Sequence, residues 1–479
     1  MSVITMAHID AAARNHMAHN LAVAHELGIS VASMGWALQN ASHNSVYGLV
    51  FKNLNNKNFA TASAWQTLAD IDDAVFAKDV ICDLVDGLDK TAYTNVTDLF
   101  SDQTRVNLIT ADPIAVKAIY LSDTALTALL ASGWWSAKVI GIALVNNGGG
   151  AGEWQRVDFE GNNLTGTEYN FGNSYYTSHP CYNLSEVTYD GQNLISIPKT
   201  YVKTGVGPSG SDQEGKQIFW VCDKPAAGFH LHPAFMLGGS EIDQFYWGAY
   251  KAGVDSGKLT SVAGVACRVS AAQSVFEDEA DARNVPGVTG FRLTSYHELC
   301  IIQRLLLIEL GSPDVQALIH AGHTAGSSQV ATNHASELGA SWRGLNGLWG
   351  NVLQLMVGWQ NDVVDDVQTI RLWDRDGNQT FVNAGTNDNL TAAWRYATGL
   401  NGGSGTGYDH TDGFLPSATD ATSTNGMLAS GYYGSTGLRR YDHGGNWGSG
   451  ADAGVFCVSA HFAPSISSTS SGCRLARVV

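Results

Sequence analysis

The sequence predicts an α+β chain. An N-terminal helical and mixed module, residues 1–185, precedes a domain of irregular, loop-rich β-sheet with one main helix, residues 186–479. Residues 1–45 are rich in alanine and lack proline, which favours helix. A capped apolar segment with helical spacing follows residue 290. Most of the remaining C-terminal part consists of short apolar strands between glycine-rich loops, and the chain contains 53 glycines.

The composition argues against several classes of function. Only 15% of the residues are charged, against about 25% in ordinary domains, and the net charge of −17 disfavours nucleic acid as a partner. No run of about 18 apolar residues occurs, so no membrane-spanning helix is expected. The N-terminus lacks the basic and apolar regions of a signal peptide, which predicts synthesis in a cytoplasm without that export route.

The N-terminal module shows no catalytic signature, and an attachment or assembly role is expected for it. His16 and His19 lie three residues apart and could share a metal on one helix face. No cysteine or suitably spaced acid completes such a site, so helix–helix contacts are the stronger interpretation. A buried strand over residues 137–145 ends at a triple-glycine turn that lacks the lysine of a phosphate loop. The expected helical segments cover residues 1–45, 63–68, 70–76, 113–120 and 122–132.

One helix of the C-terminal domain is defined at both ends by its sequence. Thr294 or Ser295 caps its start, and Glu298 completes a capping box with Ser295. Apolar residues then recur at helical spacing until Gly311. The expected strands cover residues 194–202, 219–222, 242–250, 370–373 and 380–382, and long loops are expected over 383–450.

The last 35 or so residues predict a closing hairpin. A Gly-Gly-Asn-Trp turn at 444–447 precedes a short apolar strand at 453–456, a loop over 459–471 and a strand at 474–477. Trp447 and Trp349 are expected in the core. Arg474 and Arg477 face opposite sides of a strand, and each is expected to pair with an acid.

The seven cysteines show no Cys-x-x-Cys spacing and predict free, buried thiols rather than a disulfide framework. Cys457 and Cys473 are expected on neighbouring strands, where a bond between them is the alternative.

An ordered set of motifs between residues 197 and 477 resembles bacteriophage tail-fibre and receptor-binding proteins with a C-terminal C-type-lectin-like domain. The motifs are Ile-Pro-Lys at 197–199, His-Pro-Ala-Phe at 232–235, Gly-Phe-Arg-Leu at 290–293, Trp-Arg-Gly-Leu-Asn-Gly-Leu-Trp-Gly-Asn at 342–351, and the closing Gly-Gly-Asn-Trp and Arg-Leu-Ala-Arg. The resemblance implies a rigid frame that displays variable loops, recognition of a host surface, and no cofactor.

Enzymatic and calcium-binding alternatives are disfavoured by particular residues. Formylglycine-generating enzymes share the fold but need two cysteines shortly after the Gly-Gly turn, and residues 447–454 contain none. Asp374, Asp376 and Asn378 alternate as calcium ligands do, yet the closing glutamate position holds Gly385, so a hairpin turn is the stronger interpretation. No Gly-x-Ser-x-Gly elbow or β-helix repeat indicates a hydrolase, although carboxylates that pair only in space leave a glycosidase open.

The predicted receptor contacts are polar and aromatic residues on the C-terminal loops, because tyrosine and tryptophan rings give large contact areas with few rotatable bonds. These candidates are Tyr408, Asp409, His410, Tyr432, Tyr433, Arg439, Tyr441, Asp442, His443, Ser449, Asp452, His461 and Phe462.

The sequence therefore predicts a virion structural protein, a tail fibre or tail-tip adhesin, that binds a host-surface glycan or outer-membrane protein. Residues 1–185 would attach it to other virion proteins, and a homo-oligomer, most often a trimer in such fibres, would supply avidity. The alternative is a capsid or tail decoration or head-fibre protein without receptor binding. A formylglycine-generating-type enzyme ranks third.

Overall fold

The computed structural model describes residues 48–51, 116–119, 138–224, 229–387, 391–400, 404–405, 408–409 and 412–479. Two compact units are present, one of Met1–Lys138 with Cys222–His230 and the other of Val139–Val221 with Leu231–Val479. Within the described residues, no helix is long and apolar enough to cross a membrane.

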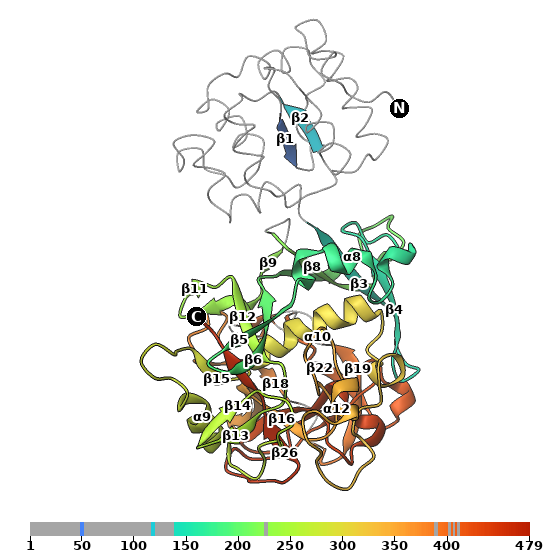
Figure 1. Cartoon of the computed structure of the whole chain (residues 1–479). Helices are drawn as coiled ribbons and strands as arrows, with labels where there is room; N and C mark the ends of the chain where they lie inside the picture. Colours follow the sequence, from blue (N-terminus) through green and yellow to red (C-terminus); the bar gives the residue numbers. More distant parts are fainter. Residues whose placement is uncertain are drawn as a thin grey trace, which may run out of the picture. The chain divides into compact units, whose positions relative to one another are not determined.

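The first unit contains one described strand pair. Strands β1 (Gly48–Phe51) and β2 (Val116–Ile119) are antiparallel (Figure 1), so the helix predicted over 113–120 is wrong at the residues of β2. The other helices expected before residue 133, together with His16 and His19, lie outside the described residues.

Three larger sheets make up most of the described chain. The first has the order β4-β3-β8-β7-β9, the second β15-β27-β12-β6-β5, and the third β18-β17-β16-β24-β25-β23-β19-β22 with β26 beside β16. The first contains β3 (Val139–Asn146), β4 (Glu153–Val157), β7 (Tyr201–Val206), β8 (Gln217–Cys222) and β9 (His230–Leu231). The second contains β5 (Ser185–Tyr189), β6 (Gln192–Pro198), β12 (Gln244–Gly248), β15 (Phe291–Leu293) and β27 (Leu475–Arg477).

The third sheet carries most of the C-terminal residues. Its strands are β16 (Leu353–Val364), β17 (Val367–Trp373), β18 (Phe381–Thr386), β19 (Trp394–Leu400), β22 (Pro416–Asp420), β23 (Gly431–Tyr433), β24 (Arg439–Gly444), β25 (Gly454–Ser459) and β26 (Ser471–Cys473). Short hairpins are formed by β10 (Met236–Leu237) with β11 (Ser240–Glu241), β13 (Gly253–Asp255) with β14 (Lys258–Thr260), and β20 (Ser404–Gly405) with β21 (Tyr408–Asp409). The helices are α8 (Ser174–Ser178), α9 (Gln273–Asp281), α10 (Tyr296–Leu310), α11 (Val315–Leu318) and α12 (Ala335–Gly339). This β-rich, loop-rich fold with few helices is compatible with the lectin-like α+β class predicted.

The domain boundary lies earlier than the sequence predicted. Strand β3 confirms the buried strand expected over 137–145, but it pairs with β4 and lies next to β8. Residues 139–185 therefore fold with the C-terminal domain instead of with the N-terminal module, and residue 185 is not a boundary. The single strand expected over 194–202 is also two strands, β6 and β7, in different sheets.

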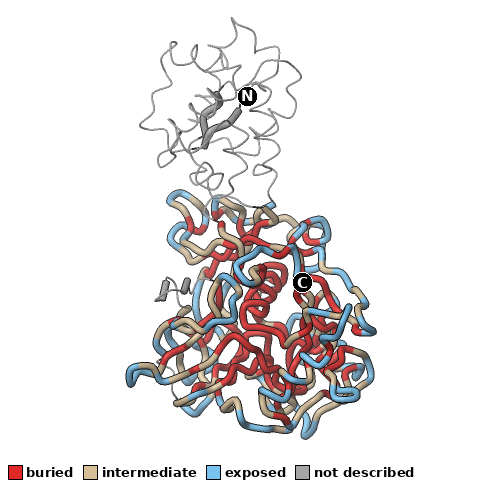
Figure 2. The backbone as a smooth tube through the Cα atoms, turned by 90° about the vertical axis from the view of Figure 1, so that its left-hand side faces the viewer, coloured by how far each residue is buried: buried red, intermediate tan, exposed pale blue. Residues whose placement is uncertain are grey.

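Helix α10 forms the centre of the hydrophobic core, and both of its predicted ends are confirmed. The Ser295 hydroxyl accepts a hydrogen bond from the Glu298 backbone N–H, and the Glu298 carboxylate accepts one from the Ser295 N–H. Gly311 ends the helix in the left-handed conformation at φ 74°. All residues of α10 are buried, and the helix appears as a continuous red coil in Figure 2. It contacts both β3 and β16.

Replacing Ser295 with alanine is expected to lower the free energy of unfolding by about 1 kcal/mol, because the Glu298 N–H loses its partner at a buried helix start. Chemical denaturation measures the change. Thr422 is a matched control, because it precedes a short helical turn without a side-chain capping bond, and its alanine variant should change stability by less than about 0.5 kcal/mol. Equal effects of the two substitutions would contradict the capping role.

The turn between β17 and β18 confirms the predicted hairpin. Asp374 Oδ1 accepts hydrogen bonds from the backbone N–H groups of Asp376 and Asn378, at 3.1 and 3.0 Å. This carboxylate therefore closes the turn. Within the described residues, no group of three or more histidine, cysteine or acidic side chains is placed to hold a metal ion.

Two expectations about the C-terminal part are wrong. Residues 383–450 are not only loops, since they include β19, β22, β23 and β24. Nor do the last strands form a hairpin: β25 lies between β24 and β23, whereas β27 lies between β12 and β15 in another sheet. Cys457 and Cys473 are accordingly both buried free thiols.

Arg474 and Arg477 bind carbonyl groups instead of the expected acids. The Arg474 guanidinium is fully buried and donates to Gln354 Oε1 at 2.8 Å and to the Gly248 carbonyl at 2.7 Å. Arg477 donates to the Thr289 carbonyl and lies over the Tyr189 ring, 3.6 Å from its centroid. Both side chains therefore hold segments of the fold together.

Candidate recognition surface

One face of strands β19 and β23 presents aromatic side chains at the protein surface. Trp394 lies opposite Tyr433 in the antiparallel register, so the two side chains share a face of the sheet. Their ring centroids are 5.4 Å apart and the rings meet at 74°. Each is half-buried, so part of each ring is open to solvent.

The loop after β25 extends this group into a row. The rings of Tyr433 and His461 lie 5.1 Å apart, and those of His461 and Phe462 lie 5.0 Å apart. His461 is exposed and Phe462 is half-buried. We call Trp394, Tyr433, His461 and Phe462 the aromatic row. It joins residues from two strands and one loop into one surface.

A polar pair borders the aromatic row at Trp394. Tyr396 donates its hydroxyl hydrogen to Asp452 Oδ1, with an O···O distance of 2.6 Å. Burial, followed by this hydrogen bond and the negative charge of Asp452, raises the pKa of Tyr396 to about 12. Asp452 lies in a helical turn (Gly450–Asp452) and forms no ion pair within the described residues.

Gly431 allows Trp394 and Asp452 to lie side by side. Gly431 is opposite Tyr396 in the register of β19 and β23, so it lies on the sheet face that carries Trp394 and Tyr396. A Cβ atom at this position would be 2.6 Å from the Trp394 ring, closer than real contacts allow, and 3.1 Å from Asp452 Cβ, which is a tight contact. The indole and the carboxylate therefore both lie against the space that this glycine leaves.

A buried ion pair fixes the loop that carries His461 and Phe462. Arg440 Nε donates to Asp442 Oδ2 at 3.1 Å, and both side chains are almost fully buried. The Arg440 guanidinium also donates to the Ile466 carbonyl and to Ser471 Oγ, while Ser471 donates to Asp442 Oδ1. The Arg440 backbone N–H bonds to the Phe462 carbonyl. Residues 462–471 are thus tied to β24 along their length.

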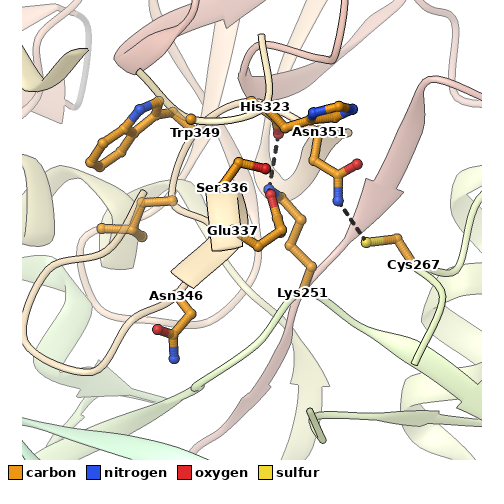
Figure 3. A network of polar contacts seen from close by, with 12 residues as sticks. Lys251, Cys267, His323, Ser336, Glu337, Asn346, Trp349 and Asn351 are labelled. Atoms are coloured by element: carbon orange, nitrogen blue, oxygen red, sulfur yellow. Dashed lines mark hydrogen bonds and ion pairs between the residues drawn. The ribbon is translucent and has the colours of Figure 1, made fainter. Parts of the chain in front are cut away.

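A second buried network surrounds Lys251 (Figure 3). Lys251 Nζ lies 3.1 Å from Glu337 Oε1 and 2.9 Å from the Gly350 carbonyl, and Asn351 donates to Cys267 Sγ at 3.4 Å. The Gly350 N–H bonds to the Gly444 carbonyl, and the Trp447 N–H bonds to the Asn351 carbonyl. The network therefore holds the Gly-Gly-Asn-Trp turn on a rigid base.

The cysteines of this region lie in buried surroundings that favour the protonated thiol over the thiolate. Burial raises the pKa of Cys267 to about 12, and it raises the pKa values of Cys457 and Cys473 further. Thiols with such pKa values stay protonated at neutral pH and are poor nucleophiles.

Four predicted receptor contacts come together at this surface: Tyr433, Asp452, His461 and Phe462. Ser449 is half-buried, and its hydroxyl accepts a hydrogen bond from the Asn446 N–H within the turn. Arg439 is half-buried on β24. Tyr408 and Asp409 form β21, and His410 lies outside the described residues.

Four other predicted contacts are wrong, because their side chains are buried where no receptor reaches them: Tyr432, Tyr441, Asp442 and His443. Strand β24 is buried on both of its faces, which explains the burial of the last three. Tyr441 packs against Tyr296 and Trp359 on the core side, whereas Asp442 faces outward but is covered by the loop that it anchors. Trp349 is in the core as predicted, but Trp447 is only half-buried.

Trp394 and Tyr396 were missed by the sequence analysis. The available signal was the Trp-Arg-Tyr alternation at 394–396, which is typical of a strand with one aromatic face. The surrounding glycine, asparagine and threonine residues made the segment look like a loop.

No protein-family model matches the chain, and neither does any curated protein. Among solved structures, the chain is similar to Treponema denticola variable protein 1, with 11% identity and a TM-score of 0.26 over 62% of this chain and 99% of that one. It is also similar to the P3c and U1 variants of the Major Tropism Determinant, each with 12% identity and a TM-score of 0.25. These cover 60% and 68% of this chain, and 82% and 92% of the respective structures. Likenesses this weak do not assign the chain to a family.

Proposed function

We propose that the chain is a virion adhesin that recognises the host cell surface through the aromatic row and the adjoining Tyr396–Asp452 pair. The observation that carries the proposal is a contiguous set of partly exposed rings on a rigid base, with the loop fixed by the buried Arg440–Asp442 pair. Clusters of partly exposed aromatic residues on rigid supports are typical of recognition surfaces. Attachment to the particle is assigned to the segment before residue 139, and assembly as a homo-oligomer would supply avidity.

Replacing Trp394, Tyr433 and His461 together with alanine is expected to weaken binding of the labelled chain to host cells by at least about 30-fold. This corresponds to the loss of about 2 kcal/mol, as at one binding hot spot. Saturation binding to the bacterial host of the particle, followed by flow cytometry, measures the change.

Phe171→Ala is the matched control, because this residue is an exposed aromatic outside the row, at 43% exposure. Its binding should equal that of the unchanged chain. Circular dichroism establishes that each variant is folded. If the folded, unchanged chain binds particles but no cells, a decoration role replaces the adhesin proposal.

A further inference from the structure

The corner formed by Trp394, Tyr433 and Asp452 combines two features that bind organic cations. Aromatic ring faces attract cations electrostatically, and a carboxylate adds a charge-assisted hydrogen bond. The contacts around Gly431 place the Asp452 carboxylate next to the Trp394 indole. Tyr433 meets that indole at 74°, so the faces of the two rings point in different directions.

The Asp452 carboxylate is free to form an ion pair with such a ligand. Its Oδ1 accepts a hydrogen bond from Tyr396, whereas no lysine, arginine or histidine in the described part of the chain forms an ion pair with it. Asp362 and Asp442, by contrast, each pair with an arginine. Asp452 is half-buried, so an uncompensated charge here gains more from a cationic partner than a fully solvated one would.

We propose that this corner binds a lysine or arginine side chain of a receptor protein on the host surface, an inference that rests on the function proposed above. The charged end would lie between the Trp394 ring and Asp452, and the aliphatic stem along Tyr433. The net charge of −17 favours the approach of a basic surface at long range. Lysine and arginine side chains have an apolar stem and a charged end, so the stem can pack on an aromatic ring while the charged end reaches the carboxylate.

The decisive variant is Asp452→Asn, which keeps an oxygen for the Tyr396 hydroxyl and removes the charge. We expect cell binding to weaken at least tenfold at low salt and to become less dependent on salt. Asp255→Asn is the matched control: Asp255 is exposed and accepts a hydrogen bond from the Ser256 hydroxyl, so the substitution makes the same change in net charge elsewhere. Its binding and its salt dependence should stay close to those of the unchanged chain.

Chemical treatment of the cells identifies the ligand. Acetylation of surface lysines or modification of surface arginines with phenylglyoxal should abolish binding, as should protease treatment, whereas periodate oxidation of glycans should leave it intact.

Undiminished binding by Asp452→Asn would overturn the basic-side-chain inference while leaving the adhesin function in place. Loss of binding after periodate alone would overturn it in favour of a glycan. Absence of cell binding by the unchanged chain would count against the adhesin function itself.

Discussion

Replacement of Asp442 by asparagine is expected to lower the free energy of unfolding by about 3–5 kcal/mol, because it leaves the Arg440 guanidinium buried without its counter-charge. The guanidinium is only 1% exposed, so water cannot take over the role of the carboxylate. Urea denaturation of the purified chain measures the loss. The anchored loop should also become more open, so amide hydrogen exchange of residues 462–471 is expected to accelerate.

The matched control is Asp362→Asn. Asp362 pairs with Arg371 at 3.3 Å, but the two side chains are 29% and 32% exposed. An ion pair with this exposure contributes less than about 1 kcal/mol. A loss at Asp442 no larger than that at Asp362 would refute the anchoring role of the buried pair.

Acidification from pH 7 to pH 5 is expected to destabilise the protein, with most of the loss below pH 6.5. Burial lowers the pKa of His297 to about 4, and it lowers the pKa values of His232 and His443 well below the ordinary value near 6.5. Below pH 6.5 these histidines therefore bind protons in the unfolded chain, whereas in the folded chain they stay largely neutral. Below pH 6.5, each such histidine reduces the free energy of unfolding by up to about 1.4 kcal/mol per pH unit, and carboxyls whose pKa is raised by burial, such as Glu277, offset part of the loss.

His443→Leu isolates one contribution to this pH dependence. Neither ring nitrogen of His443 has a hydrogen-bond partner within the described residues, and Arg474 and Lys251 add repulsion to the effect of burial. The leucine variant should be at least as stable as the unchanged protein at pH 7 and should lose less stability on acidification. Thermal unfolding at several pH values measures both, and an unchanged pH slope would refute the role of His443.

Local signals predicted the parts of the fold that local chemistry determines. The capping box of α10, its terminal glycine and the hairpin at Asp374 each depend on hydrogen bonds within a few residues, and each was located correctly. The buried strand β3 was found because it is a continuous apolar run. These elements need no knowledge of distant segments.

The strands and surface residues that the sequence did not predict are those whose position depends on pairing with distant segments. Strand β22 (Pro-Ser-Ala-Thr-Asp) contains few apolar residues and is stabilised by its pairing with β19, which only the folded sheet supplies. In the same way, adjacent residues such as Tyr441 and Asp442 differ in role because one faces the core and the other lies under a loop. The aromatic row joins residues far apart in the chain, so no local motif could have indicated its full membership.

The position of β27 also affects how the protein reaches its native state. This strand pairs with β12 on one side and β15 on the other, although both precede it by long stretches of chain. Contacts of such sequence separation require loop closure before they contribute any stabilisation, so folding of this sheet is expected to be slow. Until β27 is in place, β12 and β15 each expose an unpaired edge, and strand edges of this kind promote aggregation. Dilute conditions or chaperones should therefore increase the yield of folded protein.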